Sequence, residues 1–411
     1  MVQTRKKALL VENIHPGAVA LLAQAGFEVE TLKAALKPDE MAARLAGVHL
    51  LGIRSKTQIT QAALASAPDL IALGCFCIGT NQVDLGSANA LGVPVFNAPF
   101  SNTRSVAELV IGEIIMLSRQ LGDRSREVHE GKWRKVSAGC FEVRGKTLGI
   151  VGYGHIGSQV GVLAEAMGLR VVFFDVATKL PMGNNRSLAT LGDLLEQSDF
   201  VTLHVPATRE THGMMGEPQI AGMKRGAYLI NASRGTVVDI AALAAAIASG
   251  QVGGAAVDVY PEEPEGASDA FASPLRNLPN VILTPHIGGS TEEAQEMIGR
   301  EVATSLIKLI DSGTTTASVN FPNVELPMTP GLHRVLNVHR NVPGVLGDVN
   351  HIVSQHGGNI RGQTLSTDAS IGYLVMDLEV TAGAEGVAVA GAVAADIAKL
   401  VTNIKTRVVA S

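Results

Sequence analysis

The sequence predicts an α/β protein in which parallel sheets are followed by a small mixed unit at the C-terminus. Between residues 8 and 96, short apolar runs alternate with helical stretches, which is the order that parallel strands and their crossover helices produce. Residues 146–175 repeat this order around a glycine-rich turn. From residue 333 the pattern becomes strand, helix, strand, strand, helix, strand, which is the order of a ferredoxin-like unit.

The first part of the chain contains several apolar runs of strand length. They are Ala8–Val11, Leu50–Gly52, Ile71–Gly74 and Pro94–Phe96. A long apolar helix is expected from about Arg104 to Leu117, and it should carry the chain into a second domain that ends near Ile287. A second long helix, expected over Thr291–Ile310, returns the chain to the first domain. Residues 319–329 contain prolines and no periodicity, so we expect a linker or a last strand there.

The C-terminal unit is expected to alternate strands and helices as a ferredoxin-like fold does. Strands are expected over Arg334–Val338, Asn359–Ser366, Ile371–Leu378 and Arg407–Ala410, and helices over Pro343–Gln355 and Val387–Val401. The unit carries no catalytic group of residues of its own. Its presence therefore predicts a role in regulation or assembly.

A glycine-rich turn in the second domain is the candidate cofactor site. The apolar run Lys146–Val151 is followed by glycines in the spacing G-x-G-x-x-G and then by a helix expected from Ser158. The glycines are Gly152, Gly154 and Gly157, and His155 and Ile156 occupy variable positions of the motif. Glycines at this spacing let the backbone approach a pyrophosphate, which the N-terminus of the helix stabilises. Taken alone, the motif also fits a tight turn that binds nothing.

An acidic residue after the next strand makes the nucleotide interpretation stronger. The run Arg170–Phe174 ends in Asp175, at the distance expected for a carboxylate that accepts hydrogen bonds from the adenosine ribose. This carboxylate would repel a 2′-phosphate, so NAD is favoured over NADP. Lys179 weakens that preference slightly. We therefore expect NAD as the cofactor.

Three charged side chains follow neighbouring strands of the same expected domain. Arg234 follows Ala227–Ile230, Glu263 follows Gly254–Val259, and His286 follows Val281–Leu283. Because the carboxyl ends of parallel strands meet at one edge of a sheet, these side chains could converge on one crevice. An arginine can clamp a carboxylate, and a histidine oriented by a glutamate can move a proton near neutral pH. The set fits oxidation of a 2-hydroxy acid or reduction of a 2-oxo acid.

Each of these residues has a purely structural alternative. Arg234 could be a surface arginine in a strand-to-helix turn, and Glu263 could be one of several solvated acids in its segment. Other histidines could be mistaken for catalysts. His204 lies near a strand end and is interpreted as a residue that shapes the cofactor cleft. His286 stands apart because Arg234 and Glu263 complete its group.

Taken together, these motifs resemble the D-isomer-specific 2-hydroxyacid dehydrogenases. The matching segments are Gly52–Ser55, Gly74–Asp84, Val95–Glu108, Gly152–Gly157, Leu203–Pro206, Asn231–Asp239 and Thr284–Thr291. Phe100–Ser105 and the C-terminal extension are similar to the branch of the family that oxidises 3-phosphoglycerate in serine synthesis. The resemblance therefore implies NAD-dependent oxidation of 3-phospho-D-glycerate to 3-phosphohydroxypyruvate, with reduction of 2-oxoglutarate as a side activity.

The same resemblance implies a three-domain organisation. A Rossmann-type NAD-binding domain over residues 102–288 would be inserted in a flavodoxin-like substrate-binding domain of residues 1–101 and 289–331. A regulatory ACT domain with a ferredoxin-like fold would occupy residues 333–411. Two other functions stay open at this point. The chain could act on glyoxylate, hydroxypyruvate or lactate, or it could sense NAD without turnover.

The resemblance also assigns roles to further residues. Arg54 with Ser55, at the end of a strand, is the candidate phosphate site of the substrate, and Asn102 joins them by resemblance only. Asp258 would lie by the nicotinamide, and the other cofactor contacts would come from Ala232, Ser233, Gly288 and Gly289. The effector would be L-serine, bound between two ACT domains. Its candidate ligands are His339, Asn341 and Asn359, and the family is usually tetrameric.

Composition limits the partners that the chain can have. The net charge of −5 gives no electrostatic support for binding nucleic acid or an acidic membrane. The three cysteines lack the spacing of metal ligands, so no metal is expected, and they suit a reducing compartment. The N-terminus has no long apolar run behind it, so we expect a cytoplasmic protein.

Overall fold

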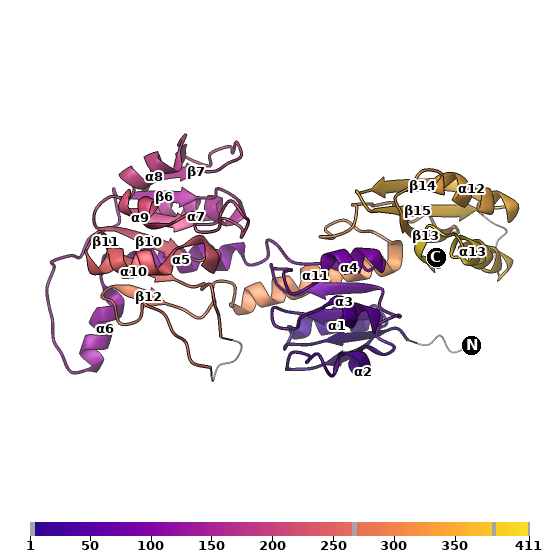
Figure 1. Ribbon diagram of the computed structural model, residues 1–411, viewed down its shortest axis with the longest axis horizontal. Helices are drawn as coiled ribbons and strands as arrows, with labels where there is room; N and C mark the ends of the chain where they lie inside the picture. Colours follow the sequence, from indigo (N-terminus) through magenta and orange to yellow (C-terminus); the bar gives the residue numbers. More distant parts are fainter. Residues whose placement is uncertain (1–4, 265–268, 380–383, 410–411) are drawn as a thin grey trace. The chain divides into compact units, whose positions relative to one another are not determined.

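The computed structural model describes residues 5–264, 269–379 and 384–409. The chain divides into two compact units (Figure 1). The first unit holds residues 1–101 and 295–411, and the second holds residues 102–294. The predicted separation of residues 333–411 as a domain of its own stays a prediction, although these residues form a separate sheet.

The N-terminal sheet of the first unit is parallel and has the order β2-β1-β3-β4-β5. Its strands are β1 (Lys7–Leu10), β2 (Glu28–Thr31), β3 (Leu50–Ile53), β4 (Ala72–Cys75) and β5 (Val95–Phe96). Its helices are α1 (Pro16–Gln24), α2 (Met41–Leu45), α3 (Gln61–Ala65) and α4 (Leu85–Ala90). The order 2-1-3-4-5 is that of flavodoxin, so the predicted fold is confirmed.

A separate apolar core covers each face of this sheet. One core contains buried residues of α2 and α3, such as Leu45 and Leu64. The other contains α1 together with α11 (Glu292–Ser312), whose Ile298, Val302 and Leu306 pack against the sheet (Figure 1). The helix expected over Thr291–Ile310 therefore returns the chain to the first sheet, as predicted.

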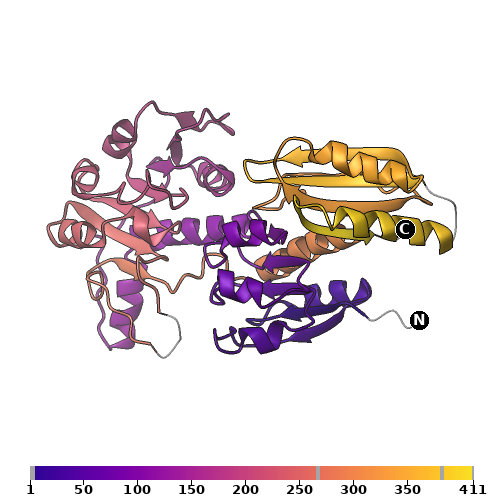
Figure 2. The ribbon, with the colours of Figure 1, turned by 45° about the vertical axis from the view of Figure 1, so that its right-hand side comes forward.

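The C-terminal sheet is antiparallel and has the order β14-β15-β13-β16. Its elements are β13 (His333–Arg340), α12 (Val345–Gln355), β14 (Asn359–Thr367), β15 (Ile371–Glu379), α13 (Ala384–Ile397) and β16 (Asn403–Val409). Both helices share one core on one face of the sheet (Figure 2). The ferredoxin-like prediction is confirmed. The last strand begins earlier than expected, at Asn403, and Ala410 lies outside the described residues.

A buried arginine ties this sheet to the rest of the first unit. Arg334 is 0% exposed and makes a two-point ion pair with Asp377, at 2.6 Å from Nε and 2.7 Å from Nη2. Its remaining N–H groups donate to the carbonyl oxygens of Ser312, Leu326 and Pro327. Ser312 is the last residue of α11, so the C-terminal sheet is fastened to that helix.

The second unit contains one parallel sheet with the order β12-β11-β10-β9-β6-β7-β8. The strands are β6 (Thr147–Val151), β7 (Arg170–Phe174), β8 (Arg186–Ser187), β9 (Phe200–Leu203), β10 (Ala227–Asn231), β11 (Val252–Val257) and β12 (Val281–Leu283). Counted from β6, the first six strands follow the Rossmann order 3-2-1-4-5-6. The predicted nucleotide-binding fold is confirmed, and its crevice lies where β6 meets β9.

Helices cover both faces of this sheet. On one face α5 (Thr103–Ser118) and α7 (His155–Ala166) share a core with the strands. On the other face lie α8 (Leu191–Gln197), α9 (Glu217–Ala221) and α10 (Ile240–Ala248). The remaining short elements are α6 (Leu121–His129) and a 3-10 helix, η1 (Gly235–Val237).

One boundary near the candidate site differs from the prediction. The helix after the glycine loop begins at His155 rather than Ser158, because a chain without Cβ atoms at Gly152, Gly154 and Gly157 can turn at once into a helix. The segment 319–329 forms no strand, which fits the expected linker rather than the expected last strand. Ser318 instead makes an isolated antiparallel bridge to Phe96, and Asn320 accepts a hydrogen bond from the Val95 backbone N–H.

In the described part of the chain, every helix is too short or too polar to cross a bilayer. All three cysteines carry free thiols.

Candidate functional site

The predicted acid–base pair is formed in the second unit. The Nδ1 atom of His286 lies 2.8 Å from Oε2 of Glu263. The other carboxylate oxygen of Glu263 accepts a hydrogen bond from the Tyr260 backbone N–H. His286 follows β12 and adopts φ of 55°, a left-handed conformation that is uncommon for residues other than glycine. Strain of this kind is found at functional sites.

The pair shifts the pKa of both partners. The hydrogen bond from Glu263 raises the pKa of His286, although burial opposes that shift. Burial alone would raise the pKa of Glu263, but the hydrogen bond and charge of His286 lower it overall. The structure therefore holds a histidine that is easily protonated beside a carboxylate that stays ionised.

Asp258 holds the loop that carries His286. This residue follows β11 and is 1% exposed. Its carboxylate accepts hydrogen bonds from the Thr284 hydroxyl at 2.6 Å and from the backbone N–H groups of Ile287 and Gly288 at 2.8 Å each. Its negative charge also raises the pKa of His286. Asp258 thus fixes the loop 284–288 and adds to the field at the histidine.

Arg234 lies at the end of β10, on the same edge of the sheet. Its charge lowers the pKa of both His286 and Glu263, which places the guanidinium within electrostatic reach of the pair. The side chain of Asn231 shapes the turn, since its amide donates to the Arg234 carbonyl and its oxygen accepts from Ser233. The structure therefore places Arg234 at the same edge of the sheet as the hydrogen-bonded pair Glu263 and His286.

Gly235 sets the distance between the turn after β10 and the segment after β11. A Cβ atom on Gly235 would lie 1.9 Å from the carbonyl carbon of Tyr260. Only glycine allows the turn after β10 to approach the segment after β11 so closely. The sequence does not predict this contact, because Gly235 and Tyr260 are distant from each other along the chain.

The glycine loop fits a dinucleotide on structural grounds. Gly152 has φ of 91°, and a Cβ there would lie 2.5 Å from the His204 carbonyl oxygen. A Cβ on Gly157 would lie 2.2 Å from the Gly152 carbonyl oxygen, so this glycine packs the helix against the strand. A Cβ on Gly154 would meet nothing within 4 Å, which leaves that side open. The first turn of α7, with His155 and Ile156, can therefore bind a pyrophosphate through backbone N–H groups.

Asp175 is fixed at the end of β7, where the ribose is expected. Its carboxylate accepts hydrogen bonds from the backbone N–H groups of Tyr153 at 2.8 Å and Ala177 at 2.9 Å. Tyr153 stacks on Phe173 with ring centroids 3.7 Å apart, and its hydroxyl accepts a hydrogen bond from Asn185. These contacts order the segment that follows Asp175. The carboxylate suits a ribose diol and opposes a phosphate in its place.

The other predicted cofactor residues surround the same edge of the sheet. Ala232 and Ser233 lie in the turn after β10. Ser233 is buried, and its hydroxyl donates a hydrogen bond to the side-chain oxygen of Asn231. A Cβ on Gly289 would lie 2.4 Å from the Asn102 side-chain nitrogen, and Gly288 binds Asp258. His204 bonds to Thr202, and burial lowers its pKa to about 3. A histidine that stays neutral suits a structural role better than proton transfer.

The predicted phosphate site lies in the first unit. Arg54 and Ser55 follow β3, and the carboxylate of Glu12 accepts hydrogen bonds from the backbone N–H groups of Arg54, Lys56 and Thr57 at 2.8–3.2 Å. Gln82 donates to the Arg54 carbonyl at 2.6 Å. The loop backbone is thus fixed by two buried side chains. Asn102 begins α5 in the second unit and is 7% exposed. The structure does not bring Asn102 and Arg54 together within one unit.

The predicted serine ligands lie at opposite ends of one sheet. His339 is buried, bonds to Asn337 and pairs with Gly372 at the start of β15. Asn341 donates to the Asp368 carbonyl near the same end. Asn359 instead pairs with Glu379 at the far end of β15. A single chain therefore does not bring the three side chains together.

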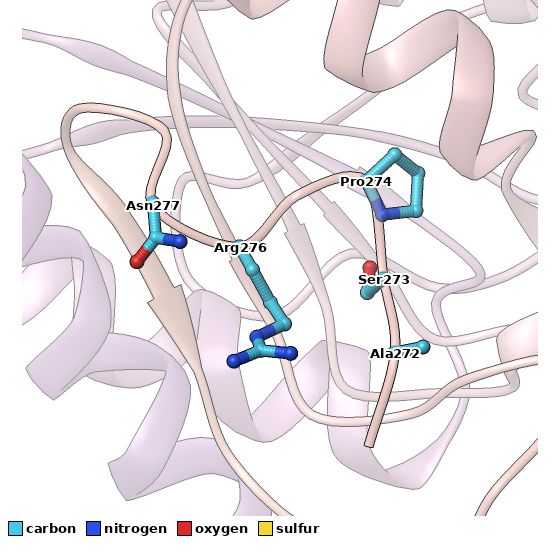
Figure 3. Close-up of a pocket in the computed structure, with 5 residues that line it drawn as sticks. All are labelled: Ala272, Ser273, Pro274, Arg276 and Asn277. Atoms are coloured by element: carbon cyan, nitrogen blue, oxygen red, sulfur yellow. The ribbon is translucent and has the colours of Figure 1, made fainter. Parts of the chain in front are cut away.

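An open hollow elsewhere on the second unit is lined by Ala272, Ser273, Pro274, Arg276 and Asn277 (Figure 3). The Arg276 guanidinium extends into it and donates to the Phe271 carbonyl. The hollow contains none of the predicted site residues. Across the described residues, no group of three His, Cys, Asp or Glu side chains could hold a metal ion.

Comparisons with known proteins agree with the fold and with the predicted family. Residues 111–288 match the family described as D-isomer specific 2-hydroxyacid dehydrogenase, NAD binding domain, and residues 336–403 match the AHAS small subunit-like ACT domain. The D-3-phosphoglycerate dehydrogenase of Dictyostelium discoideum is 54% identical over 402 residues, covering 98% of this chain and 97% of that relative. The enzyme of the same name from Escherichia coli K12 is 53% identical, covering 91% of each chain.

A solved structure shows the likeness in three dimensions. The D-lactate dehydrogenase of Aquifex aeolicus, determined as a complex with NAD and lactic acid, aligns with a TM-score of 0.67 and 28% identity. The alignment covers 77% of this chain and 100% of that one.

Proposed function

This chain belongs to the D-3-phosphoglycerate dehydrogenases, a family of D-isomer-specific 2-hydroxyacid dehydrogenases, and we propose that it oxidises 3-phospho-D-glycerate to 3-phosphohydroxypyruvate. The observation that carries the chemistry is the group of Arg234, Glu263 and His286 at the carboxyl edge of the NAD-binding sheet. The substrate follows from the names of the relatives and from the cationic loop at Arg54.

Each member of the group has a distinct task. Arg234 binds the substrate carboxylate through its planar fork and polarises the oxygen on C2. Neutral His286 accepts the proton of the C2 hydroxyl, and protonated His286 returns it in the reverse direction. Glu263 fixes the ring through Nδ1 and stabilises the charged imidazolium. NAD, when bound, supplies the hydride acceptor.

Two alternative functions are weaker. Another 2-hydroxy acid, such as lactate, has no phosphate for Arg54 to bind and leaves the C-terminal unit without a purpose. A protein that only senses NAD has no need for a proton-transfer pair beside a carboxylate clamp. Reduction of 2-oxoglutarate remains compatible with the proposal, since its distal carboxylate can use the phosphate site.

The substrate proposal is tested with the variant Arg54→Ala. The wild-type chain should form NADH with 3-phosphoglycerate and far more slowly with D-lactate or D-glycerate. Arg54→Ala should raise KM for 3-phosphoglycerate by about 10- to 100-fold, the loss expected for one charge-assisted contact, and leave D-lactate turnover nearly unchanged. Arg44→Ala, which removes an exposed partner of Glu30, serves as the control. Equal losses on all substrates would show that Arg54 does not bind the phosphate.

We further propose that L-serine inhibits the enzyme from a site between two C-terminal units. Support comes from the opposite placement of His339 and Asn359 on β15. Strand β14 lies at the edge of its sheet, so antiparallel pairing with β14 of a second copy would bring Asn359 to the end that holds His339 of the other copy. This pairing, together with a second contact elsewhere on each chain, would give the proposed homotetramer.

The effector proposal predicts a specific loss in the variant Asn359→Ala. Millimolar serine should inhibit the wild-type chain, and Asn359→Ala should need about tenfold more serine, since it loses a hydrogen bond to a charged ligand. The control Asn350→Ala removes an amide of the same unit that binds Gln363. Activity without serine should stay unchanged in both variants. Equal serine sensitivity of Asn359→Ala and the wild type would reject this residue as a ligand.

A cytoplasmic location is also proposed. It is supported by the three free thiols, which suit a reducing compartment.

A further inference from the structure

One buried carboxyl group near the candidate site is not used by the proposed mechanism. Glu113 lies on α5 and is 2% exposed. Neither of its carboxyl oxygens has a hydrogen-bond partner in the part of the chain that the structure describes. An unpaired buried carboxylate is strongly destabilising, so the packing of α5 does not by itself account for a glutamate at this position.

Glu113 lies on the face of α5 that is turned toward the loop 284–288. A Cβ on Gly288 would lie 3.1 Å from the Asp258 carboxylate, 3.4 Å from Val106 and 3.8 Å from Leu109. Val106 and Leu109 belong to the face of α5 that continues to Glu113 one turn further on. The same helix packs against β10, β11 and β12, the strands that end at the site.

Asp258 and Glu113 form a pair of like groups. Burial, and then the negative charge of Asp258, raise the pKa of Glu113 to about 8. Both side chains are buried, and two buried carboxylates within electrostatic reach of each other cannot both ionise at low cost. The proton is best placed on Glu113, because the Asp258 carboxylate accepts three hydrogen bonds from the loop 284–288, whereas the Glu113 oxygens have no partner among the described residues.

We propose that Glu113 is a positioning residue of the dehydrogenase. Its protonated carboxyl leaves the negative charge on Asp258, which then holds the loop 284–288 and His286 in place for proton transfer. Ionisation of Glu113 adds a second negative charge behind Asp258 and loosens that loop. This inference rests on the proposed dehydrogenase function, but the protonation of Glu113 can be measured without substrate.

The other titratable groups around α5 do not replace Glu113 in this role. Tyr260 donates to the carbonyl oxygens of Val257 and Thr284, and burial raises the pKa of its phenol. Burial also raises the pKa of Tyr228 on β10. The core residues of α7 and β12 against α5 are apolar. On α6, Asp123 accepts from the Asn280 backbone N–H, near the C-terminal end of α5.

The kinetic test compares Glu113→Gln with the wild type in the oxidation direction, where His286 must be neutral. Wild-type activity should fall by up to about tenfold per pH unit above about pH 8, as Glu113 ionises. Glu113→Gln imitates the protonated form, so its alkaline limb should move to higher pH while its acid limb stays in place. The control Glu108→Gln alters an exposed carboxyl on the same helix. Coincident alkaline limbs in Glu113→Gln and wild type would overturn the proposal.

The second measurement is the unfolding temperature without substrate. Glu113 has an ordinary pKa of 4.5 and a folded value of about 8, so the unfolded chain loses this proton first. Wild-type stability should therefore fall relative to Glu113→Gln from about pH 5 to about pH 8 and then stay parallel. If the difference in unfolding temperature between the two proteins did not change with pH, Glu113 would not be protonated in the folded protein. If Glu113→Gln does not fold, the infrared spectrum of the wild type provides the test. The band of a protonated carboxyl should vanish above about pH 8, and a band that persists would contradict the proposal.

Discussion

The variant His286→Asn is expected to lose about 10²- to 10⁴-fold in kcat in both directions, which is the contribution of a well-placed general acid–base. Asparagine can still accept or donate a hydrogen bond at the position of the ring, so Glu263 and the loop 284–288 keep a partner. It cannot take a proton from the C2 hydroxyl. Binding of NADH should stay within about twofold of wild type, since the substitution leaves the glycine loop and Asp175 unchanged.

Steady-state rates and the quenching of protein fluorescence by NADH measure the two parts of this prediction. His129→Asn, which changes an exposed histidine on α6, controls for the substitution itself. A variant that keeps wild-type turnover would remove His286 from the mechanism. A variant that also loses NADH binding would instead mean that His286 holds the cofactor or the loop.

The pH dependence of oxidation tests the role of His286 independently. Oxidation requires neutral His286, so the rate should rise with pH through the pKa of that histidine. Glu263 raises this pKa through its hydrogen bond. In Glu263→Gln the carboxylate is gone, and the acid limb should move to lower pH. The maximal rate should fall as well, because the imidazolium loses its counter-ion.

The architecture of this chain was accessible from the sequence because local patterns and topology agree. Short apolar runs and a glycine motif predicted the two parallel sheets, and the strand orders are those of flavodoxin and of a Rossmann domain. The ends of the elements were less predictable. The helix over His155–Ala166 begins earlier than expected because the motif's glycines impose no Cβ constraint on its first turn. Strand β16 begins earlier because its pairing with β13 comes from tertiary contacts.

For the candidate site, the sequence supplied the residue types and the structure supplied their mutual distances. The three catalytic candidates could be chosen because each one follows a strand of one parallel sheet. The role of Asp258 as the anchor of the loop 284–288 could not, since its partners are backbone N–H groups without a sequence signal. The burial of Glu113 could not be predicted either, because a glutamate on a mostly apolar helix is expected at an exposed position, as Glu108 on the same helix is.

The variant Arg234→Ala should raise KM for the hydroxy acid by about 100-fold or more, because it removes both arms of a carboxylate clamp. Arg234→Lys keeps the charge but not the planar fork, so it should lie between the alanine variant and wild type. Binding of NADH should be nearly unchanged. Arg225→Ala, an exposed arginine just before β10, is the matched control. An unchanged KM in Arg234→Ala would move the clamp to another residue.

The same substitution makes a second and opposite prediction for the pH profile. The charge of Arg234 lowers the pKa of His286, whereas Glu263 raises it. Removing the arginine should therefore move the acid limb of oxidation to higher pH, and removing the glutamate charge should move it to lower pH. If Arg234 were an unrelated surface residue, its loss would leave the limb in place. Shifts of opposite sign from Arg234→Ala and Glu263→Gln would identify His286 as the group that both residues control, because a general loss of stability cannot move one titration in two directions.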